Sequence, residues 1–126
     1  MSRILIISSL AAMVMAATPA LADGDAAAGE KVFIKCKACH ENEQGVNKIG
    51  PTLKGIVGRK TASVEGYAYS DAMKAANVVW TAETLDTFLT NPQAMIPGNK
   101  MALGAVKDAE QRTQLIAYLK SASKPD

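Results

Sequence analysis

The most constraining feature of this 126-residue chain is the pentapeptide Cys36-Lys37-Ala38-Cys39-His40, which contains both cysteines and the single histidine of the sequence. Cys-x-x-Cys-His is the attachment signal of c-type haem. Two thiols at this spacing can each add to a vinyl group of one porphyrin, and the next side chain can face the iron. On a helical turn Cys36, Cys39 and His40 share one face. The motif therefore predicts one haem c, covalent through Cys36 and Cys39, with His40 as an iron ligand.

Cys-x-x-Cys also occurs in redox-active dithiol sites and in zinc sites. A thioredoxin-like dithiol would follow a strand in a βαβ unit, whereas residues 31–35 read as helix. A structural zinc site normally takes four ligands, and beyond Cys36, Cys39 and His40 the chain has no second pair. A chance occurrence of the pentapeptide stays open as a third alternative. Haem attachment accounts for the motif best.

The N-terminal segment has the layout of a secretory signal peptide. Residues 1–22 carry one charge, Arg3, then an uncharged apolar run to Ala17, and they end in the small-x-small sequence Ala20-Leu21-Ala22. The run is short and alanine-rich for a transmembrane span, so an uncleaved anchor is the less favoured alternative. We expect cleavage after residue 22, a single domain over residues 23–126, and export to a Gram-negative periplasm or an equivalent compartment.

Composition indicates a thin core. Val, Ile, Leu and Phe make up only 20 of the 104 residues that follow the predicted cleavage site. In the same 104 residues, 13 Lys and Arg nearly balance 12 Asp and Glu. The small net charge argues against disorder through charge repulsion and against a nucleic-acid binder. A bound haem would supply the missing apolar bulk, so we expect the chain without haem to be largely unfolded.

Hydrophobic periodicity and capping residues predict an all-α domain without strands or repeats. The predicted helices run from Asp25 to Cys36, from Ser70 to Asn77, from Thr81 to a stop before Pro92, and from Asp108 to a stop before Ser121. Gly29, on the apolar face of the first helix, marks a close crossing, and the last helix should pack there. Residues 41–66 read as loop, with at most a brief helical turn in residues 51–57.

A second axial ligand must come from a residue other than histidine, and a methionine thioether is the usual choice in electron-transfer cytochromes. The predicted mature domain offers Met73, Met95 and Met101. Met73 lies within a short predicted helix and Met95 just beyond one, where a methionine more often fills a gap in the core. Met101 follows an irregular Pro-Gly loop that can bring it inward, and we predict it as the ligand.

With these motifs in view, the chain resembles a class I cytochrome c, most similar to the cytochrome c2 and mitochondrial cytochrome c branch. The resemblance covers nearly all of residues 23–126. Its pieces are Gly29 and Phe33, the pentapeptide 36–40, Gly50-Pro51-Thr52-Leu53, Gly58-Arg59-Lys60, Tyr67 to Ala72, Trp80, Asn91-Pro92, Ile96 to Met101, and Leu115 to Lys120.

The resemblance implies a small cytochrome c fold, in which the terminal helices cross and short middle helices and loops surround one haem. It implies thioethers at Cys36 and Cys39, axial ligands His40 and Met101, and a hydrogen bond from His40 to the Pro51 carbonyl. By the same resemblance, Arg59, Tyr69 and Trp80 lie near a haem propionate. Two departures, Met73 and Phe88, would remove hydrogen-bonding groups that the family often has on the Met101 side.

A haem with both axial positions filled has no open site for substrate, which predicts a one-electron carrier and not an enzyme. The alternative is a peroxidase-like or ligand-binding haem protein with a labile methionine. The family suggests a shuttle from a cytochrome bc complex or a periplasmic dehydrogenase to a terminal oxidase or photosynthetic reaction centre, with no nucleic acid, no stable membrane insertion and a monomeric state.

Charge predicts modest electrostatic steering toward such partners. Lysines expected to rim the haem edge are Lys35, Lys37, Lys48, Lys54 and Lys100. Such a ring would speed encounter with an acidic partner in a salt-dependent way. Gln93 and Ala94 stand where relatives often carry lysine, so we expect weaker steering than in strongly basic members.

Overall fold

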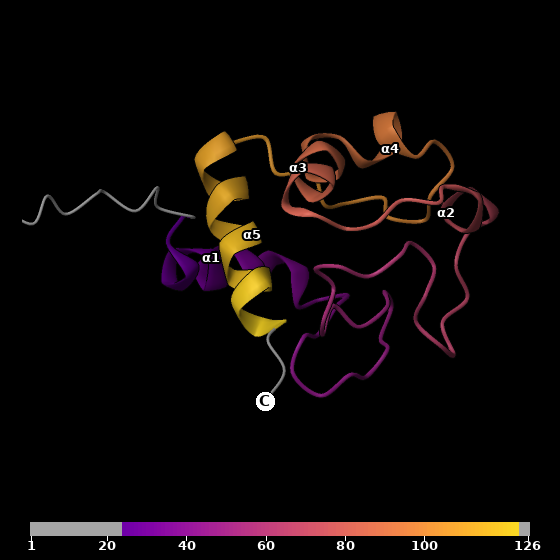
Figure 1. Ribbon diagram of the computed structural model, residues 1–126, viewed down its shortest axis with the longest axis horizontal. Helices are drawn as coiled ribbons and strands as arrows, with labels where there is room; N and C mark the ends of the chain where they lie inside the picture. Colours follow the sequence, from indigo (N-terminus) through magenta and orange to yellow (C-terminus); the bar gives the residue numbers. More distant parts are fainter. Residues whose placement is uncertain (1–23, 124–126) are drawn as a thin grey trace, which may run out of the picture.

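The computed structural model describes residues 24–123 and is all-α, as predicted (Figure 1). Within this range the only β-type pairing is an isolated antiparallel bridge between Lys60 and Val79. The predicted signal peptide lies outside the described residues. The helical elements are α1 (Ala26–Phe33), a 3-10 turn (Ile34–Cys36), α2 (Asp71–Ala75), α3 (Ala82–Thr90), α4 (Pro92–Met95) and α5 (Ala109–Ala122).

The first helix begins as predicted and ends earlier than predicted. Asp25 caps α1, because its carboxylate accepts hydrogen bonds from the N–H groups of Ala27 and Ala28. The α-helix stops at Phe33 and tightens into the 3-10 turn that ends at Cys36. Helices often tighten this way near their ends, because hydrogen bonds between residues three apart satisfy carbonyls that have no partner in the α-helix.

The two terminal helices cross at Gly29, which confirms the predicted close approach (Figure 1). Gly29 is buried, and a Cβ at this position would collide with the backbone carbonyl of Gln114 in α5. Beside the crossing, the rings of Phe33 and Tyr118 pack 5.4 Å apart. Phe33 and Leu115 are each only 1% exposed, so the crossing forms the most deeply buried part of the core.

Helices α2, α3 and α4 lie beside this pair (Figure 1). The Ser70 hydroxyl caps α2, and Thr81 and Thr84 form a reciprocal capping box at the start of α3. Helix α3 ends before Pro92, as predicted, and buries the apolar stripe expected of it, Leu85, Phe88 and Leu89.

Helix α4 was not predicted. Pro92 ends α3 and also opens this short helix, because proline suits the first helical turn, where its missing N–H is not needed. The Asn91 side chain caps it by accepting a hydrogen bond from Ala94 N. Met95 therefore lies inside a helix and not beyond one.

The last helix begins at its predicted cap, where the Asp108 carboxylate accepts a hydrogen bond from Gln111 N. It runs past its predicted end, to Ala122. Ser121 does not stop it, because the hydroxyl bonds back to the Tyr118 carbonyl at 2.7 Å.

The segment between the 3-10 turn and α2 lacks regular helix, as predicted, and consists of turns such as the one at Leu53 to Ile56 and of irregular chain with the Lys60 bridge. Residues 24–123 contain no helix that is both long and apolar enough to cross a bilayer. Most buried apolar residues of the core lie on the terminal helices and α3. The buried apolar members of the core are Val32, Phe33, Ile56, Trp80, Leu85, Phe88, Leu89, Ile96, Leu115, Ile116 and Leu119.

Candidate haem site

The pentapeptide folds as a helical turn at the end of the first helix. The N–H groups of Cys39 and His40 both donate to the carbonyl of Cys36, at 3.1 and 2.8 Å. This geometry brings Cys36, Cys39 and His40 to one side of the turn. Both thiols are free, and burial, aided by the neighbouring Cys39, raises the pKa of Cys36 while Lys35 opposes the rise.

The His40 ring is held from two sides. Its Nδ1 lies 2.7 Å from the Pro51 carbonyl oxygen, the contact expected from the resemblance. The backbone of Gly50 lies flat against the ring, since a Cβ there would collide with it. Burial lowers the pKa of His40 despite the Pro51 hydrogen bond, and Lys48 adds to the lowering. The ring is therefore neutral, with Nδ1 as donor and with Nε2 making no hydrogen bond to any described residue.

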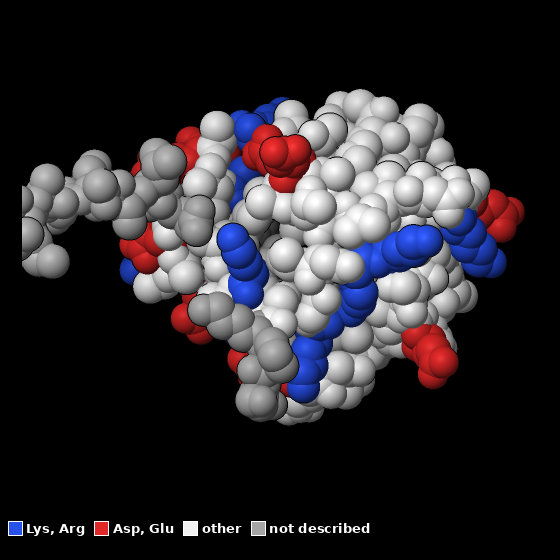
Figure 2. Space-filling view, viewed as in Figure 1, with Lys and Arg blue, Asp and Glu red and all other residues white. Residues whose placement is uncertain are grey.

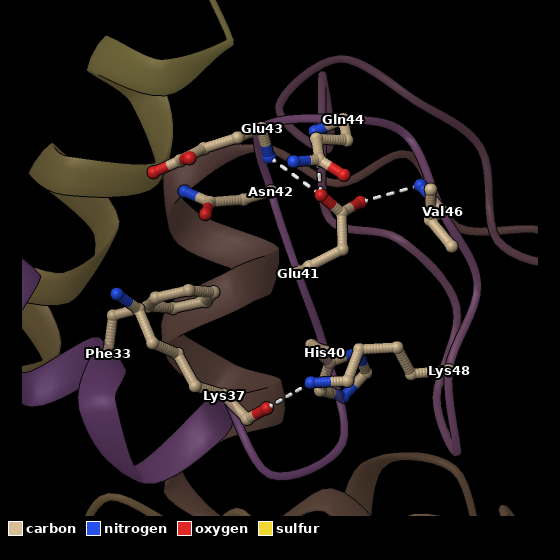
Figure 3. A pocket seen from close by; sticks show the side chains of 9 residues that line it. All are labelled: Phe33, Lys37, His40, Glu41, Asn42, Glu43, Gln44, Val46 and Lys48. Atoms are coloured by element: carbon tan, nitrogen blue, oxygen red, sulfur yellow. Dashed lines mark hydrogen bonds between the residues drawn. The ribbon is translucent and has the colours of Figure 1, made fainter.

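Glu41 organises the loop that carries Pro51 (Figure 3). Its carboxylate accepts hydrogen bonds from the N–H groups of Glu43, Gln44 and Val46 and from the hydroxyl of Thr52. Burial opposes ionisation of this carboxyl, but these four donors outweigh it and lower the pKa of Glu41 to about 2.

The same loop is tied to the pentapeptide along its backbone. Leu53 N donates to the Glu41 carbonyl at 2.7 Å, and Gly50 N donates to the Cys39 carbonyl at 2.8 Å. An open hollow of about 330 Å³ lies beside it, with His40 in its wall (Figure 3). Pro51 thus lies between two backbone attachments to the turn that carries His40.

Met101 is half-buried at the edge of the core. Its N–H donates to the side-chain oxygen of Asn99 at 2.8 Å, and the Asn99 amide donates in turn to the carbonyls of Pro92 and Ile96. A Cβ at Gly104 would collide with the Met101 methyl carbon, so the chain folds back against this side chain. Asn99 therefore fastens Met101 to α4.

Arg59 lies beside both Trp80 and Tyr69, two of the residues predicted to lie near a propionate. Trp80 N donates to the Arg59 carbonyl at 2.8 Å, and the Trp80 carbonyl accepts from Gly58 N at 2.7 Å. Burial lowers the pKa of Arg59, and the nearby Tyr69 partly offsets this. The Arg59 guanidinium donates to the carbonyls of Thr52 and Lys54, but its buried Nε has no partner among the described residues.

The two positions that depart from the resemblance, Phe88 and Met73, both belong to the apolar core or pack against it, as Met101 does. Phe88 is 6% exposed and packs edge-on against Trp80, with ring centroids 5.0 Å apart. Met73 is half-buried and packs against the core from α2. Both side chains therefore have apolar neighbours in the core.

Sequence reasoning missed three residues that shape the site: Glu41, Gln93 and Asn99. Asn99 stands inside a motif that was recognised, but its amide nitrogen bonds back to the Pro92 and Ile96 carbonyls, contacts that no periodicity predicts. Glu41 pairs with a threonine eleven residues away, and Gln93 contacts a loop five to eight residues on. Only the folded loops reveal these pairs.

Comparison with known proteins agrees with this geometry. The sequence pattern of the family described as cytochrome c matches residues 26–123. The cytochrome c of Gibberella zeae is 50% identical over 106 residues, which cover 82% of this chain and 100% of that protein. The cytochrome c2 of Blastochloris viridis is 46% identical over 97 residues and 76% of each chain. The solved structure of cytochrome cH from Methylobacterium extorquens matches with a TM-score of 0.73 and 46% identity, over 78% of this chain and 99% of that one.

An all-α domain with Cys-x-x-Cys-His at the end of its first helix falls in the class of small proteins that carry a covalent c-type haem. Its particular membership follows from the matches: the chain belongs to the cytochrome c family. The family implies a covalently bound c-type haem and supports an electron-carrier function.

The residues present fit such a group on their own chemistry. His40 offers an unbonded Nε2 on a neutral ring. One buried donor, Arg59 Nε, lacks an acceptor within residues 24–123. Buried donors are normally satisfied, so this group suits an anionic acceptor such as a propionate. Apolar side chains left half-buried at the core edge include Leu53, Val57, Met73, Val78 and Met101.

Proposed function

We propose that the chain holds one haem through Cys36 and Cys39, with His40 and Met101 as axial ligands, and that it is a one-electron carrier. The observation that carries the proposal is the turn that gathers both thiols and the imidazole on one side, with His40 Nδ1 bonded 2.7 Å from the Pro51 carbonyl. A haem held this way supplies reversible iron(III)/iron(II) exchange, with thioether ligation raising the potential.

The protein's own part is to fix the ligands. The Pro51 carbonyl holds His40 in one tautomer and raises its basicity, as such partners do for metal-bound histidines. The backbone of Gly50 prevents the ring from turning toward that side. Asn99 holds the backbone of Met101 on the other ligand segment. Two rigid supports favour the same ligand set in both oxidation states, which suits fast electron transfer.

Arg59, Tyr69 and Trp80 are proposed as donors to a propionate. The buried Arg59 Nε without a partner among the described residues supports this role, because an ionised carboxylate in a partly buried place requires hydrogen bonds and an opposite charge. Replacing Arg59 with methionine keeps its apolar stem and removes the charge. We expect the variant to shift the reduction potential, and an unchanged potential would contradict a propionate contact.

The alternative, a peroxidase-like enzyme or ligand-binding protein, requires Met101 to leave the iron readily. The bonds that fasten the Met101 backbone to α4 through Asn99 argue for a retained ligand. The absence of enzymatic activity is part of the proposal. Slow binding of added imidazole to the ferric protein supports the carrier, and fast binding with peroxide turnover supports the enzyme.

For partners, we propose docking at the haem edge by redox proteins such as a cytochrome bc complex, a cytochrome oxidase, a reaction centre or a dehydrogenase. Figure 2 shows basic side chains running across one face, with acidic ones mostly toward its margins. Two of the predicted lysines are held in place: Lys48 donates to the Lys37 carbonyl at 2.6 Å, and Lys100 to the Ala68 carbonyl at 2.8 Å. Lysines that are already ordered lose less entropy on docking.

The docking residues proposed are Lys35, Lys37, Lys48 and Lys100, all exposed. Lys48→Gln should slow reaction with an acidic partner and weaken its dependence on ionic strength. Lys74→Gln, on α2 and outside the predicted ring, is the matched control. If both variants react at the same rate, or the wild-type rate does not depend on salt, the docking surface is wrongly placed.

We also propose a periplasmic location with a cleaved signal over residues 1–22 and a monomeric domain over 23–126. The signal layout of the sequence and the similarity to cytochrome c2 proteins support this. The test is the N-terminal sequence and native mass of the chain purified from a periplasmic fraction. A mature chain that begins at Asp23 is expected, and retention of residue 1 in the membrane fraction would contradict it.

The function itself is tested by mass spectrometry and potentiometry on the purified chain. Denatured protein should retain the mass of one haem, and Cys36→Ser with Cys39→Ser should abolish that retention. Potentiometric titration should then give a reversible one-electron wave at a positive potential. Haem that dissociates on denaturation, or a wave that is not reversible, would contradict the proposal.

A further inference from the structure

Gln93 makes an unusual set of contacts for an exposed side chain. It lies in α4, and its side-chain oxygen accepts a hydrogen bond from Gly98 N at 3.2 Å. Its amide nitrogen donates to the Asn99 carbonyl at 3.0 Å and lies 3.5 Å from the Met101 carbonyl. The 3.5 Å contact is too long to be strong. One amide thus spans the backbone of the segment that leads into Met101.

That segment depends on few other attachments. It starts with a Pro97-Gly98 turn in which Gly98 has φ +86° and Asn99 N bonds to the Ile96 carbonyl, the pattern of a type II turn. Asn99 holds it from the buried side through its own side chain. Gln93 holds the same residues from the solvent side.

Beyond Met101 the chain is exposed at Ala102, Leu103 and Ala105. It is next fastened at Val106, whose N–H donates to the Leu89 carbonyl at 2.7 Å and whose carbonyl accepts from Arg112. On the N-terminal side of Met101, the backbone is therefore held by the bonds of Asn99 and Gln93, and the Lys100 side chain adds one bond to the Ala68 carbonyl at 2.8 Å.

We infer that Gln93 is a positioning residue for Met101: its amide clamps Gly98 and Asn99 and thereby limits how often the methionine leaves its place. The inference rests on the proposed ligand role of Met101. A glutamine is needed because the clamp requires an acceptor for Gly98 N and a donor for the Asn99 carbonyl on one side chain. Lysine can only donate, and methionine of similar length can do neither.

The test uses the haem-loaded ferric chain and added imidazole, which can bind only when Met101 departs. The variants are Gln93→Met and Gln93→Lys, with Ala94→Met and Ala94→Lys as controls at the next exposed position of α4. In Gln93→Met, loss of two neutral hydrogen bonds should raise the imidazole binding rate roughly tenfold, equivalent to about 1.4 kcal/mol. Gln93→Lys keeps a donor and loses only the acceptor for Gly98 N, so we expect a smaller rise in that variant. Both controls should stay within about twofold of wild type, since no side-chain bond is removed there.

A second readout separates positioning from general stability. The urea midpoint followed by helical circular dichroism should barely move in Gln93→Met, because the side chain is exposed and the core is untouched. The weak iron–sulfur band at the red end of the ferric spectrum should vanish at lower urea than in wild type.

The outcomes separate this inference from the proposed function. If both Gln93 variants bind imidazole at the wild-type rate and keep their band, the clamp is refuted while the carrier function stands. Equal acceleration in Gln93→Lys and Ala94→Lys would show a charge effect and also refute it. If the wild-type chain has no iron–sulfur band at all, the ligand role of Met101 fails, and the clamp fails with it.

Discussion

Replacing Glu41 with glutamine tests the loop that supports His40. The carboxylate has four donors, but those on Glu43, Gln44 and Val46 belong to exposed residues, where water can take over. Thr52 is only 5% exposed, so its hydroxyl loses a charged partner that water does not replace. One such bond is worth about 1.5–3 kcal/mol. The Thr52 hydroxyl can still reach the Glu41 carbonyl at 3.3 Å, so we expect a loss near the lower limit, about 1.5 kcal/mol.

The assay is urea unfolding of the haem-loaded chain at neutral pH. Glu43→Gln is the matched control, because it removes the same charge from an exposed side chain two residues away. We expect the control to change the free energy of unfolding by less than about 0.5 kcal/mol. Equal effects of the two substitutions would refute the argument, since only net charge would then matter.

The same variant predicts a pH dependence with a defined sign. The pKa of Glu41 is about 2 in the folded chain, below its ordinary value of 4.5. A depressed folded pKa contributes stability that is fully present above the ordinary pKa and is lost as pH falls toward the folded one. The stability difference between wild type and Glu41→Gln should therefore shrink between pH 4.5 and about 2. A difference that is constant over this range would contradict the hydrogen-bonded carboxylate.

Three further predictions concern the core and the haem. Gly29→Ala drives a Cβ into the Gln114 carbonyl and should destabilise the chain by about 3 kcal/mol in urea unfolding; a neutral effect would contradict the close crossing. Phe88→Tyr adds a hydroxyl to a buried ring beside Trp80 and should shift the reduction potential and the resistance of Met101 to displacement. If neither changes, position 88 does not tune the site. The chain made without haem should lack helical circular dichroism, and a well-folded apo form would refute the thin-core argument.

Local signals in the sequence predicted most helices well. Asp25, Ser70, Thr81 and Asp108 each act as the predicted cap, because short polar side chains compete for the free N–H groups of a first turn. The close crossing at Gly29 was also predictable, since a glycine on the apolar face of a helix has few other uses. The caps depend on residues within one turn of one another, and the crossing was marked by one glycine on the apolar face of its helix.

The prediction errors have two causes. Some residue types are compatible with two local structures, and some hydrogen bonds form only between segments that the tertiary fold brings together. Pro92 was interpreted only as a stop, although proline also favours a first helical turn, and α4 was missed for that reason. Ser121 was interpreted as an end, although its hydroxyl bonds back to the helix. The bonds of Glu41 and Gln93 join backbone groups that only the folded loops bring within reach, so no periodicity could have revealed them.

The most direct test of the central claim is the ferric absorption spectrum of the haem-loaded chain at neutral pH, with Met101→Ala, Met73→Leu and Met95→Leu measured beside it. The proposal predicts a weak iron–sulfur band at the red end of the spectrum in wild type. The band should persist in the Met73 and Met95 variants and disappear in Met101→Ala. A band that survives Met101→Ala, or a wild-type protein that lacks it and binds imidazole rapidly, would contradict the assignment of Met101 and the carrier function with it.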